Sequence, residues 1–448
     1  MTPDAHHLEQ GSPFAPHTAK ETDQMLATIG VDNIEDLFDI PEAVRFSDTF
    51  GIDQRDEQSV RRELDLLFEQ NEELVEFLGR GHYDHYIPSL VNHLSLRSEY
   101  LTSYTQYQPE IAQGFLQALF EFQSMMVELT GLEIVNCSMY DAATALGEAA
   151  RLADRARDVS GKRILVPEVM SSGRRSVLDN YIVGTGITIE SYPHSDGIAD
   201  LDAITETMDE DVLMLYAESP TIRGTIEEGL EELAAAVHGV EGLFVLGSDP
   251  IALAVLERPG TIGADIVIGD AASLGLGSSH GMGLGLFATR ERYLRQVPGR
   301  LVGVSTDTND RRAFTLTLQT REQHIRRERA TSNICTNQAW VALRTAMHIA
   351  ILGADGLIDL ATTCIETPAE VADRLDDIVG VKAPVFDRHH FREFTVHTDQ
   401  PAQAVAADLE GSGYAVHVVG EHRLQVCVTE TNHDYIDGFA AAFREAAR

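Results

Sequence analysis

The sequence predicts an α/β fold: a mostly parallel sheet covered by helices on both faces, with a helical arm before it and a smaller α+β domain after it. Six short apolar runs recur between residues 163 and 288, and helical segments such as 227–240 separate most of them. Continuous apolar strands spaced by helices are typical of parallel sheets buried on both faces. With 448 residues and 44% hydrophobic content, the chain is long enough for one large domain and a smaller one.

The N-terminal part, residues 1–80, is expected to form a tail and a helical arm. Residues 1–19 mix Pro, Gly and His without periodicity, which is typical of a poorly ordered terminus. Apolar residues then recur at three-to-four spacing, as they do in amphipathic helices. An aromatic loop over 79–109 follows, and then a long apolar helix over 111–130 that Gly131 closes as its C-cap.

The large α/β domain is expected over residues 81–337, and a linking helix and the small α+β domain over 338–448. The six strands of the large domain are predicted at 163–166, 187–190, 212–216, 243–246, 265–268 and 285–288. The linking helix should break at 353–356, where two glycines interrupt it. Beyond it, the pattern predicts a helix, a strand, a helix, two strands and a final helix.

The chain is strongly acidic, with a formal charge of −37 from 71 acidic and 34 basic residues, and its lysines are Lys20, Lys162 and Lys382 alone. A carboxylate-rich surface with arginine in place of lysine stays soluble when salt screens its self-repulsion, so we expect a salt-adapted, cytoplasmic protein. Nucleic acid is excluded as a partner, because phosphate backbones bind positive surfaces. No apolar run is long enough to predict a membrane span, and the four scattered cysteines have no metal-ligand spacing.

Arginine is concentrated in one place, since Arg321, Arg326, Arg327 and Arg329 lie within nine residues. One interpretation is a solvated helix face whose arginines pair with glutamates at helical spacing, each pair contributing about 0.2–0.5 kcal/mol. The other is a segment that closes an anionic site or a subunit contact, because the rigid guanidinium fork suits carboxylates and phosphates.

The expected domains also suggest a family. A helical arm, a large α/β domain and a small α+β domain form the arrangement of the aspartate-aminotransferase-like enzymes of fold type I, which use pyridoxal phosphate. Residues 83–88, 98–114, 138–145, 298–303 and 316–338 resemble the P-protein of the glycine cleavage system, specifically subunit 1 of its two-subunit form. The last of these segments, LTLQTREQHIRRERATSNICTNQ, is the most specific.

This resemblance implies decarboxylation of glycine on pyridoxal phosphate, with transfer of the aminomethyl group to the lipoyl group of H-protein. That chemistry needs a lysine that holds the cofactor as a Schiff base. Against the family's catalytic half, this chain has Ala272 and Ser273 where a His-Lys pair would stand, and Leu246 where an Asp would pair with the pyridine nitrogen. Asp249 is expected to start a turn instead. The resemblance therefore implies a chain that completes the active site of a lysine-bearing subunit 2, which holds the cofactor.

The aromatic loop is the expected source of the side chains that reach into the partner's site. They are Tyr83, His85, Tyr86, Thr105, Tyr107 and Gln108. Rings with polar tips suit a small zwitterion such as glycine, or a lipoyl arm at a wet interface. The alternative is that half of these rings pack the arm against the sheet. His82 and His85 are not expected to bind metal, because no further ligand lies near them in the sequence.

Without the lysine and the ring-pairing Asp, this chain has little reason to hold a cofactor phosphate with its arginine run. A structural role at the junction of the two domains and the partner subunit is therefore assigned to Arg321, Arg326, Arg327 and Asn333, with direct binding as the minor alternative. Two rival hypotheses are left open. One is a non-catalytic scaffold or regulator of the same fold, and the other is a stand-alone pyridoxal enzyme that uses Lys162 or Lys382.

Overall fold

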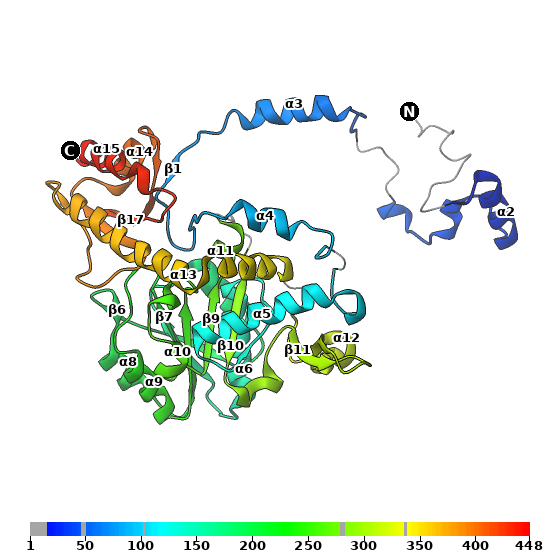
Figure 1. Ribbon diagram of the computed structural model, residues 1–448, viewed down its shortest axis with the longest axis horizontal. Coiled ribbons are helices and arrows are strands. Elements are labelled where there is room, and N and C mark those ends of the chain that lie inside the picture. Colours follow the sequence, from blue (N-terminus) through cyan, green and yellow to red (C-terminus); the bar gives the residue numbers. More distant parts are fainter. Residues whose placement is uncertain (1–15, 46–50, 102–103, 278–282, 336–337) are drawn as a thin grey trace. The chain divides into compact units, whose positions relative to one another are not determined.

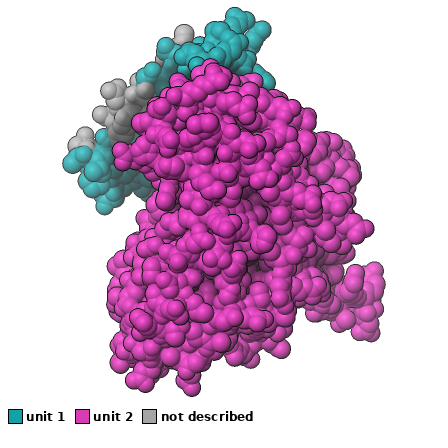
Figure 2. Space-filling view, turned by 90° about the vertical axis from the view of Figure 1, so that its left-hand side faces the viewer, with its two compact units in different colours: residues 1–72 teal, residues 73–448 magenta. Residues whose placement is uncertain are grey.

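The computed structural model describes residues 16–45, 51–101, 104–277, 283–335 and 338–448 (Figure 1). The chain divides into two compact units, residues 1–72 and 73–448 (Figure 2), and each is described by itself. Most of the predicted N-terminal tail lies outside the described residues.

The first unit consists of short helices. They are α2 (Ala19–Ile29), η1 (Ile34–Leu37), η2 (Glu42–Val44) and α3 (Glu57–Phe68). α2 begins with a capping box between Thr18 and Glu21, and it ends at Gly30, whose φ is 90°. α3 has no buried residue, and its Leu66 and Phe68 side chains are 58% and 60% exposed. Much of the apolar surface of this unit is therefore not covered within the unit.

The second unit is built around a seven-stranded sheet in the order β2-β10-β9-β8-β7-β3-β4. In that order the strands are Ile134–Val135, Gly285–Thr289, Ile266–Asp270, Leu243–Ser248, Val212–Ser219, Arg163–Pro167 and Thr188–Tyr192. The five strands from β9 to β4 pair in parallel, whereas β10 runs antiparallel to both of its neighbours. All six predicted strands are present, and the predicted α/β class is confirmed.

Burial on both faces accounts for these apolar strands. In β8, Leu243 and Val245 pack into the core on one face of the sheet, and Phe244 and Leu246 into the core on the other. The covering helices include α5 (Gln113–Thr130), α6 (Ala142–Ala156), α7 (Ser172–Tyr181) and α9 (Leu230–Gly239). The shorter elements are α4 (Ser89–Ser95), η3 (Pro109–Ile111), β5 (His194–Ser195), β6 (Ile198–Ala199), α8 (Leu201–Thr207), η4 (Ala252–Ala254), α10 (Pro259–Ile262), α11 (Ala272–Leu276) and η5 (Glu291–Gln296). α5 ends at Gly131 in the left-handed conformation, as predicted.

The long helix α13 (Ala339–Asp376) joins the large domain to the small one (Figure 1). The predicted break falls at Gly353, whose φ of 65° and ψ of −174° are not helical, and the helix then resumes. The first part of α13 packs into a core of the large domain, and Val371 and Leu375 near its end pack into the core of the small domain. By length and hydropathy α13 could cross a membrane, and half of its most apolar stretch is buried inside the protein. Its contacts with two cores account for this composition.

The small domain contains an antiparallel sheet in the order β13-β14-β17-β16. Its elements are β13 (Val381–Lys382), β14 (Glu393–Thr398), α14 (Ala402–Glu410), β15 (Tyr414–Ala415), β16 (His417–Gly420), β17 (Arg423–Cys427), η8 (His433–Tyr435) and α15 (Ile436–Ala446). β1 (Val75–Glu76) pairs with β15, and the buried ring of Phe77 stacks on Phe439 at 3.9 Å between ring centroids. Residues 75–77 thus belong to the small domain, which differs from the expectation of a helical arm up to residue 80.

A hairpin that the sequence analysis did not anticipate precedes the arginine run. It consists of β11 (Leu301–Thr306) and β12 (Arg312–Thr317) and packs beside α5. The run itself forms η6 (Gln319–Arg321), α12 (Gln323–Arg326) and η7 (Arg327–Arg329). In Figure 1 this region projects from one edge of the large domain. The arginines therefore lie on successive single turns and not on one helix face.

Candidate active site

The described part of the second unit contains a cavity of about 500 Å³ at the carboxyl ends of the central strands. Glu218 from β7, Ser248 from β8 and Asp270 from β9 line it, and α6 and α7 present their N-termini to it. Residues 80–83 and 391–393 line it as well. Ligands of parallel α/β sheets bind outside the carboxyl ends of the strands, so this cavity is the ligand site expected for the fold.

Two carboxylates of the chain itself occupy the N-terminus of α6. Asp141 caps the helix, because its Oδ1 accepts the N–H of Thr144 at 2.7 Å. Asp270 also accepts a backbone hydrogen bond from Ala142, the first residue of α6, besides those of Ala272 at 2.9 Å and Leu284 at 3.0 Å. Burial raises the pKa of Asp270, and the nearby Asp141 adds to this effect. A helix N-terminus ordinarily attracts an anion, and here side chains of the chain take that position.

No lysine is among the described residues that line the cavity. Ala272 and Ser273, the residues that follow β9, both line it. Lys162 and Lys382 form ion pairs elsewhere in the second unit, and Lys20 belongs to the first unit. A phosphate-bearing cofactor that needs a Schiff base therefore does not fit the residues present: the lysine is missing, and carboxylates stand at the helix end that would receive the phosphate.

The residues around the end of β8 also differ from a cofactor site. Leu246 is 2% exposed, packs into the core of the large domain and does not line the cavity. Asp249 starts the predicted turn, since its Oδ1 accepts the N–H of Ile251 at 2.8 Å. Its Oδ2 pairs with Arg392, a contact between residues far apart in the sequence that no pattern indicated.

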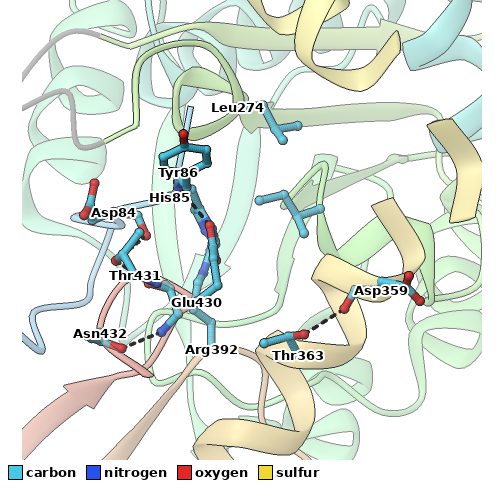
Figure 3. Close-up of polar contacts among 12 residues, drawn as sticks. Asp84, His85, Tyr86, Leu274, Asp359, Thr363, Arg392, Glu430, Thr431 and Asn432 are labelled. Carbon is cyan, nitrogen blue, oxygen red and sulfur yellow. Dashed lines mark hydrogen bonds and ion pairs between the residues drawn. The ribbon is translucent and has the colours of Figure 1, made fainter. Parts of the chain in front are cut away.

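Arg392 is the centre of a largely buried polar chain, and Figure 3 shows two of its other members, His85 and Glu430. Arg392 is 2% exposed, and its guanidinium lies 3.6 Å from the centre of the Tyr83 ring. Its Nη1 lies 2.8 Å from Nε2 of His85. Because arginine can only donate, Nε2 accepts and the imidazole proton lies on Nδ1, which then donates to Glu430 at 2.9 Å. Asp249, Arg392, His85 and Glu430 thus form one connected chain.

The geometry of His85, Cys364 and Glu430 also raises the question of a metal, because one ligand atom from each lies within 4.8 Å of the others. Metal ligands must be deprotonated. Here Nδ1 of His85 carries its proton, and burial raises the pKa of the Cys364 thiol to about 12. The guanidinium of Arg392 beside His85 further disfavours a cation. This group is better explained as packing around the polar chain.

Tyr83 and Tyr86 have different roles in the same segment. The Tyr83 hydroxyl donates to Oε1 of Glu393 at 2.6 Å, and the Arg80 backbone N–H donates to Oε2 at 2.7 Å. Burial, and next the neighbouring Glu393, raise the pKa of Tyr83, and burial raises that of Glu393. Tyr86 is 66% exposed, and only its backbone N–H contacts Glu430. The side chains of Tyr83 and His85 are thus bound within the chain, whereas that of Tyr86 faces outward.

Of the six aromatic-loop residues, only Tyr83 lines the described cavity. The Tyr107 hydroxyl donates to Oε2 of Glu322 at 3.2 Å and accepts from Nη2 of Arg300 at 3.1 Å. Thr105 is partly buried, and Gln108 is exposed just before η3. The structure therefore divides the six expected residues into two separate groups.

The arginine run is held by contacts with its own chain. Arg321 donates to the carbonyls of Val297 and Gly299, the latter at 3.2 Å, and Arg326 donates to the carbonyl of Thr320 at 3.0 Å. The glutamate–arginine helix face considered above is not formed, because Glu322 pairs with Arg300 instead.

The remaining members of the run differ in their surroundings. Asn333 accepts from the side chain of Gln323 at 3.2 Å. Arg326, Arg327 and Arg329 are exposed.

Sequence reasoning missed the residues that organise both groups, namely Asp141, Asp270, Arg300, Glu322, Arg392 and Glu393. Arg300 lies in one of the family-like segments, so a signal for it was present. Arg392 had none, because its partners come from two distant parts of the chain.

Comparison with known proteins gives a consistent result. The family model described as glycine cleavage system P-protein matches residues 12–438. A Halobacterium salinarum protein named "Probable glycine dehydrogenase (decarboxylating) subunit 1" is 57% identical, over 98% of this chain and 99% of that protein. A Bacillus subtilis protein of the same name is 43% identical, over 89% of this chain and 90% of that protein.

Solved structures are similar as well. The crystal structure of a glycine decarboxylase (P-protein) of the glycine cleavage system, in inhibitor-bound form, has a TM-score of 0.88 and 37% identity, over 97% of this chain and 100% of that one. A sphingosine-1-phosphate lyase from Burkholderia pseudomallei has a TM-score of 0.65 and 14% identity, over 91% of this chain and 94% of that one. At that identity the second likeness concerns the fold alone.

Proposed function

Because the chain belongs to the glycine cleavage system P-protein family, we propose that it is the lysine-free half of a two-subunit glycine dehydrogenase (decarboxylating) whose subunit 2 holds the pyridoxal phosphate. The family, the subunit-1 type and the fold type I of pyridoxal-phosphate enzymes are those that the sequence motifs predicted. A subunit 1 works with a partner subunit, so the enzyme is heteromeric. The scaffold hypothesis is not favoured.

The observation that carries the proposal is the cavity at the ends of β7, β8 and β9. Ala272 and Ser273 stand where a Schiff-base lysine is needed, and Asp141 and Asp270 stand at the helix end where a phosphate would bind. Both differences disfavour the cofactor in this chain, and together they support its placement in subunit 2.

The chain offers surfaces with which it could complete the partner's site. Tyr86 and Tyr107 are 66% and 43% exposed, and their amphipathic rings suit glycine or the lipoyl arm of H-protein. The first unit exposes many large apolar side chains, among them Ile52 at 85% and Val44 at 71%. Exposed apolar surface of this extent marks protein contacts, and subunit 2 is the partner that the family implies.

One experiment tests this division of labour. The chain and subunit 2 are purified separately in high salt, and the visible absorption of a pyridoxal imine and the release of carbon dioxide from glycine are followed before and after mixing. We expect the imine band with subunit 2, none with this chain, and carbon dioxide only from the mixture. A borohydride-reducible band from this chain alone would support a stand-alone enzyme instead.

A second measurement separates a catalytic contribution from a scaffold. We expect Tyr107→Ala to slow the exchange of the glycine carboxyl group with bicarbonate in an assembled enzyme. Unchanged exchange would support the scaffold hypothesis.

A further inference from the structure

Arg300 is buried, yet its guanidinium is incompletely hydrogen-bonded. It is 5% exposed, it directly precedes β11, and its Nε has no hydrogen-bond partner among the described residues. The carboxylate of Glu322 lies 3.7 Å from this Nε, which is too far for a hydrogen bond. A buried polar group without a partner costs about 1–3 kcal/mol, so such a group in a folded protein calls for an explanation.

A second arginine beside it, Arg321, also has an unsatisfied hydrogen-bond donor. Arg321 uses its two terminal nitrogens for the carbonyls of Val297 and Gly299, which fixes the backbone just before Arg300. Its Nε is buried and also lacks an acceptor among the described residues. Arg300, Arg321 and Glu322 all act electrostatically on the buried thiol of Cys137, so the two guanidinium groups and one carboxylate share one neighbourhood. The cluster carries two formal positive charges against one negative charge, in a chain whose total is −37.

Tyr107 places this cluster at the surface. Its ring is 43% exposed, and Arg300 lies 5.4 Å from the ring centre. Its hydroxyl lies between Arg300 and Glu322 and bonds to both. His324, 49% exposed, meets the ring edge-on at 5.4 Å between centroids. Tyr107 is thus the solvent-facing member of the cluster, and the guanidinium of Arg300 lies behind it.

We propose that Arg300 and Tyr107 form a receptor for an oxyanion that arrives with subunit 2, and that Glu322 and Arg321 are positioning residues that hold it ready. Unpaired guanidinium N–H groups with a net positive charge require an acceptor, and planar oxyanions match the guanidinium fork. Glu322 neutralises Arg300 in part without bonding to its Nε, so an oxyanion can displace it. This inference rests on the proposed function, under which two oxyanions reach the subunit interface: the carboxylate of glycine and the phosphate of the cofactor held by subunit 2.

The test uses the assembled two-subunit enzyme with Arg300→Gln. The enzyme with unaltered subunits is measured first: if mixing yields neither an imine band nor carbon dioxide, the proposed function fails and not this inference. With that established, glycine binding is titrated through the imine spectrum, and cofactor release is followed by loss of the same band on dilution. We expect a loss of about 10- to 100-fold in one of the two affinities, as for the removal of charge-assisted hydrogen bonds.

The two measurements, glycine binding and cofactor release, identify the source of the oxyanion. Weaker glycine binding with unchanged cofactor release assigns the receptor to the carboxylate, and faster cofactor release assigns it to the phosphate. Arg311→Gln is the matched control: it removes one arginine from the neighbouring hairpin, where the side chain is 76% exposed and pairs with Asp307, and both affinities should stay unchanged. If Arg300→Gln also leaves both affinities unchanged in a fully assembled enzyme, a bridging water satisfies the cluster and the proposal is overturned.

Two further variants keep the test decisive if Arg300→Gln does not fold or assemble. Arg300→Lys retains the charge and removes the fork, so most of the loss should persist. Glu322→Gln keeps an acceptor for Tyr107 and removes the competing charge, so the same ligand should bind more tightly. A merely structural role for Glu322 predicts weaker binding instead, and that result would contradict the proposal.

Discussion

The strand-end cavity and the Arg300 cluster both hold buried arginines, but they satisfy them differently. In the cavity, Arg392 bonds directly to Asp249, and the partly buried Arg174 bonds directly to Glu218. Nε of Arg392 also lacks an acceptor, yet its charge is matched within hydrogen-bond reach. In the Arg300 cluster the carboxylate lies beyond that reach. A guanidinium whose charge is matched by a carboxylate within hydrogen-bond reach has little attraction for a further anion, whereas one whose nearest carboxylate lies beyond that reach does.

The largest expected effect tests the strand-end cavity, where the buried charges are paired. Arg392→Met should lower the free energy of unfolding by about 3–5 kcal/mol, because it leaves the Asp249 carboxylate without its partner and His85 without its donor. Thermal or denaturant unfolding of the isolated chain measures the change.

Arg388→Met is the matched control for this prediction. Arg388 pairs with Asp196 and Glu228, carboxylates that are 43% and 52% exposed, so its loss should cost less than about 1 kcal/mol. Equal losses for both variants would mean that the buried pair of Arg392 and Asp249 contributes no more to stability than the exposed pairs of Arg388.

The two sites also show which features the sequence could predict and which it could not. The strands were predictable because parallel strands buried on both faces are continuous apolar runs, and the position of Ala272 and Ser273 followed from the strand before them. The polar chain was not, since His85 and Glu430 are 345 residues apart and Arg392 and Asp249 are 143 apart. Only the folded chain brings such residues together.

The aromatic loop shows the same limit at short range. His85 and Tyr107 belong to one loop in the sequence, yet α4 lies between them and they contact different parts of the protein. The hairpin before the arginine run, by contrast, had a readable signal. In β12 the buried Phe314 and Leu316 alternate with partly exposed neighbours, which is the two-residue period of a strand with one buried face.

A smaller effect is expected from the pH dependence of the cavity. Burial raises the pKa of Asp270 in the folded state above that of the unfolded chain. At pH values between these two pKa values, the folded protein holds a proton that the unfolded chain has lost. The contribution of Asp270 to stability therefore falls as pH rises through this interval. Asp270→Asn should make this decline shallower. At pH values above the interval, the variant should unfold at a higher denaturant concentration than the unaltered chain. This gain in stability should be smaller than the loss caused by Arg392→Met.

Asp307→Asn provides a control of opposite sign. Asp307 is partly exposed on the hairpin, and backbone N–H groups, first that of Arg311, lower its pKa. Its stabilising contribution is present above the unfolded pKa and is lost as pH falls, so this variant should be less stable near neutrality and equal at low pH. If Asp270→Asn followed the same course, the carboxylate at the α6 N-terminus would be stabilised there and not strained by burial.

The smallest effect concerns the exposed arginines, which the sequence assigned to the subunit junction. Replacing Arg326 and Arg327 with glutamine should weaken assembly with subunit 2 by a few-fold to about tenfold, because exposed ion pairs contribute about 0.2–1 kcal/mol each. The loss should shrink as salt rises, and the turnover of enzyme already assembled should not change. Sedimentation at two salt concentrations measures it, with Arg175→Gln on α7 as the control, a partly exposed arginine paired within its own helix.

Within that pair, Arg327 should account for most of the effect. Arg326 already donates to the carbonyl of Thr320, so its loss acts mainly on the fold of its own segment. The guanidinium of Arg327 makes no ion pair or hydrogen bond within the described part of the chain, and its backbone has a φ of 55° and a ψ of −123°, which is costly for a residue with a side chain. A strained backbone that holds an unpaired cation outward is expected where a partner supplies the missing contact. If Arg326→Gln alone weakens assembly as much as the double variant, the junction depends on the shape of this segment and not on the charge of Arg327.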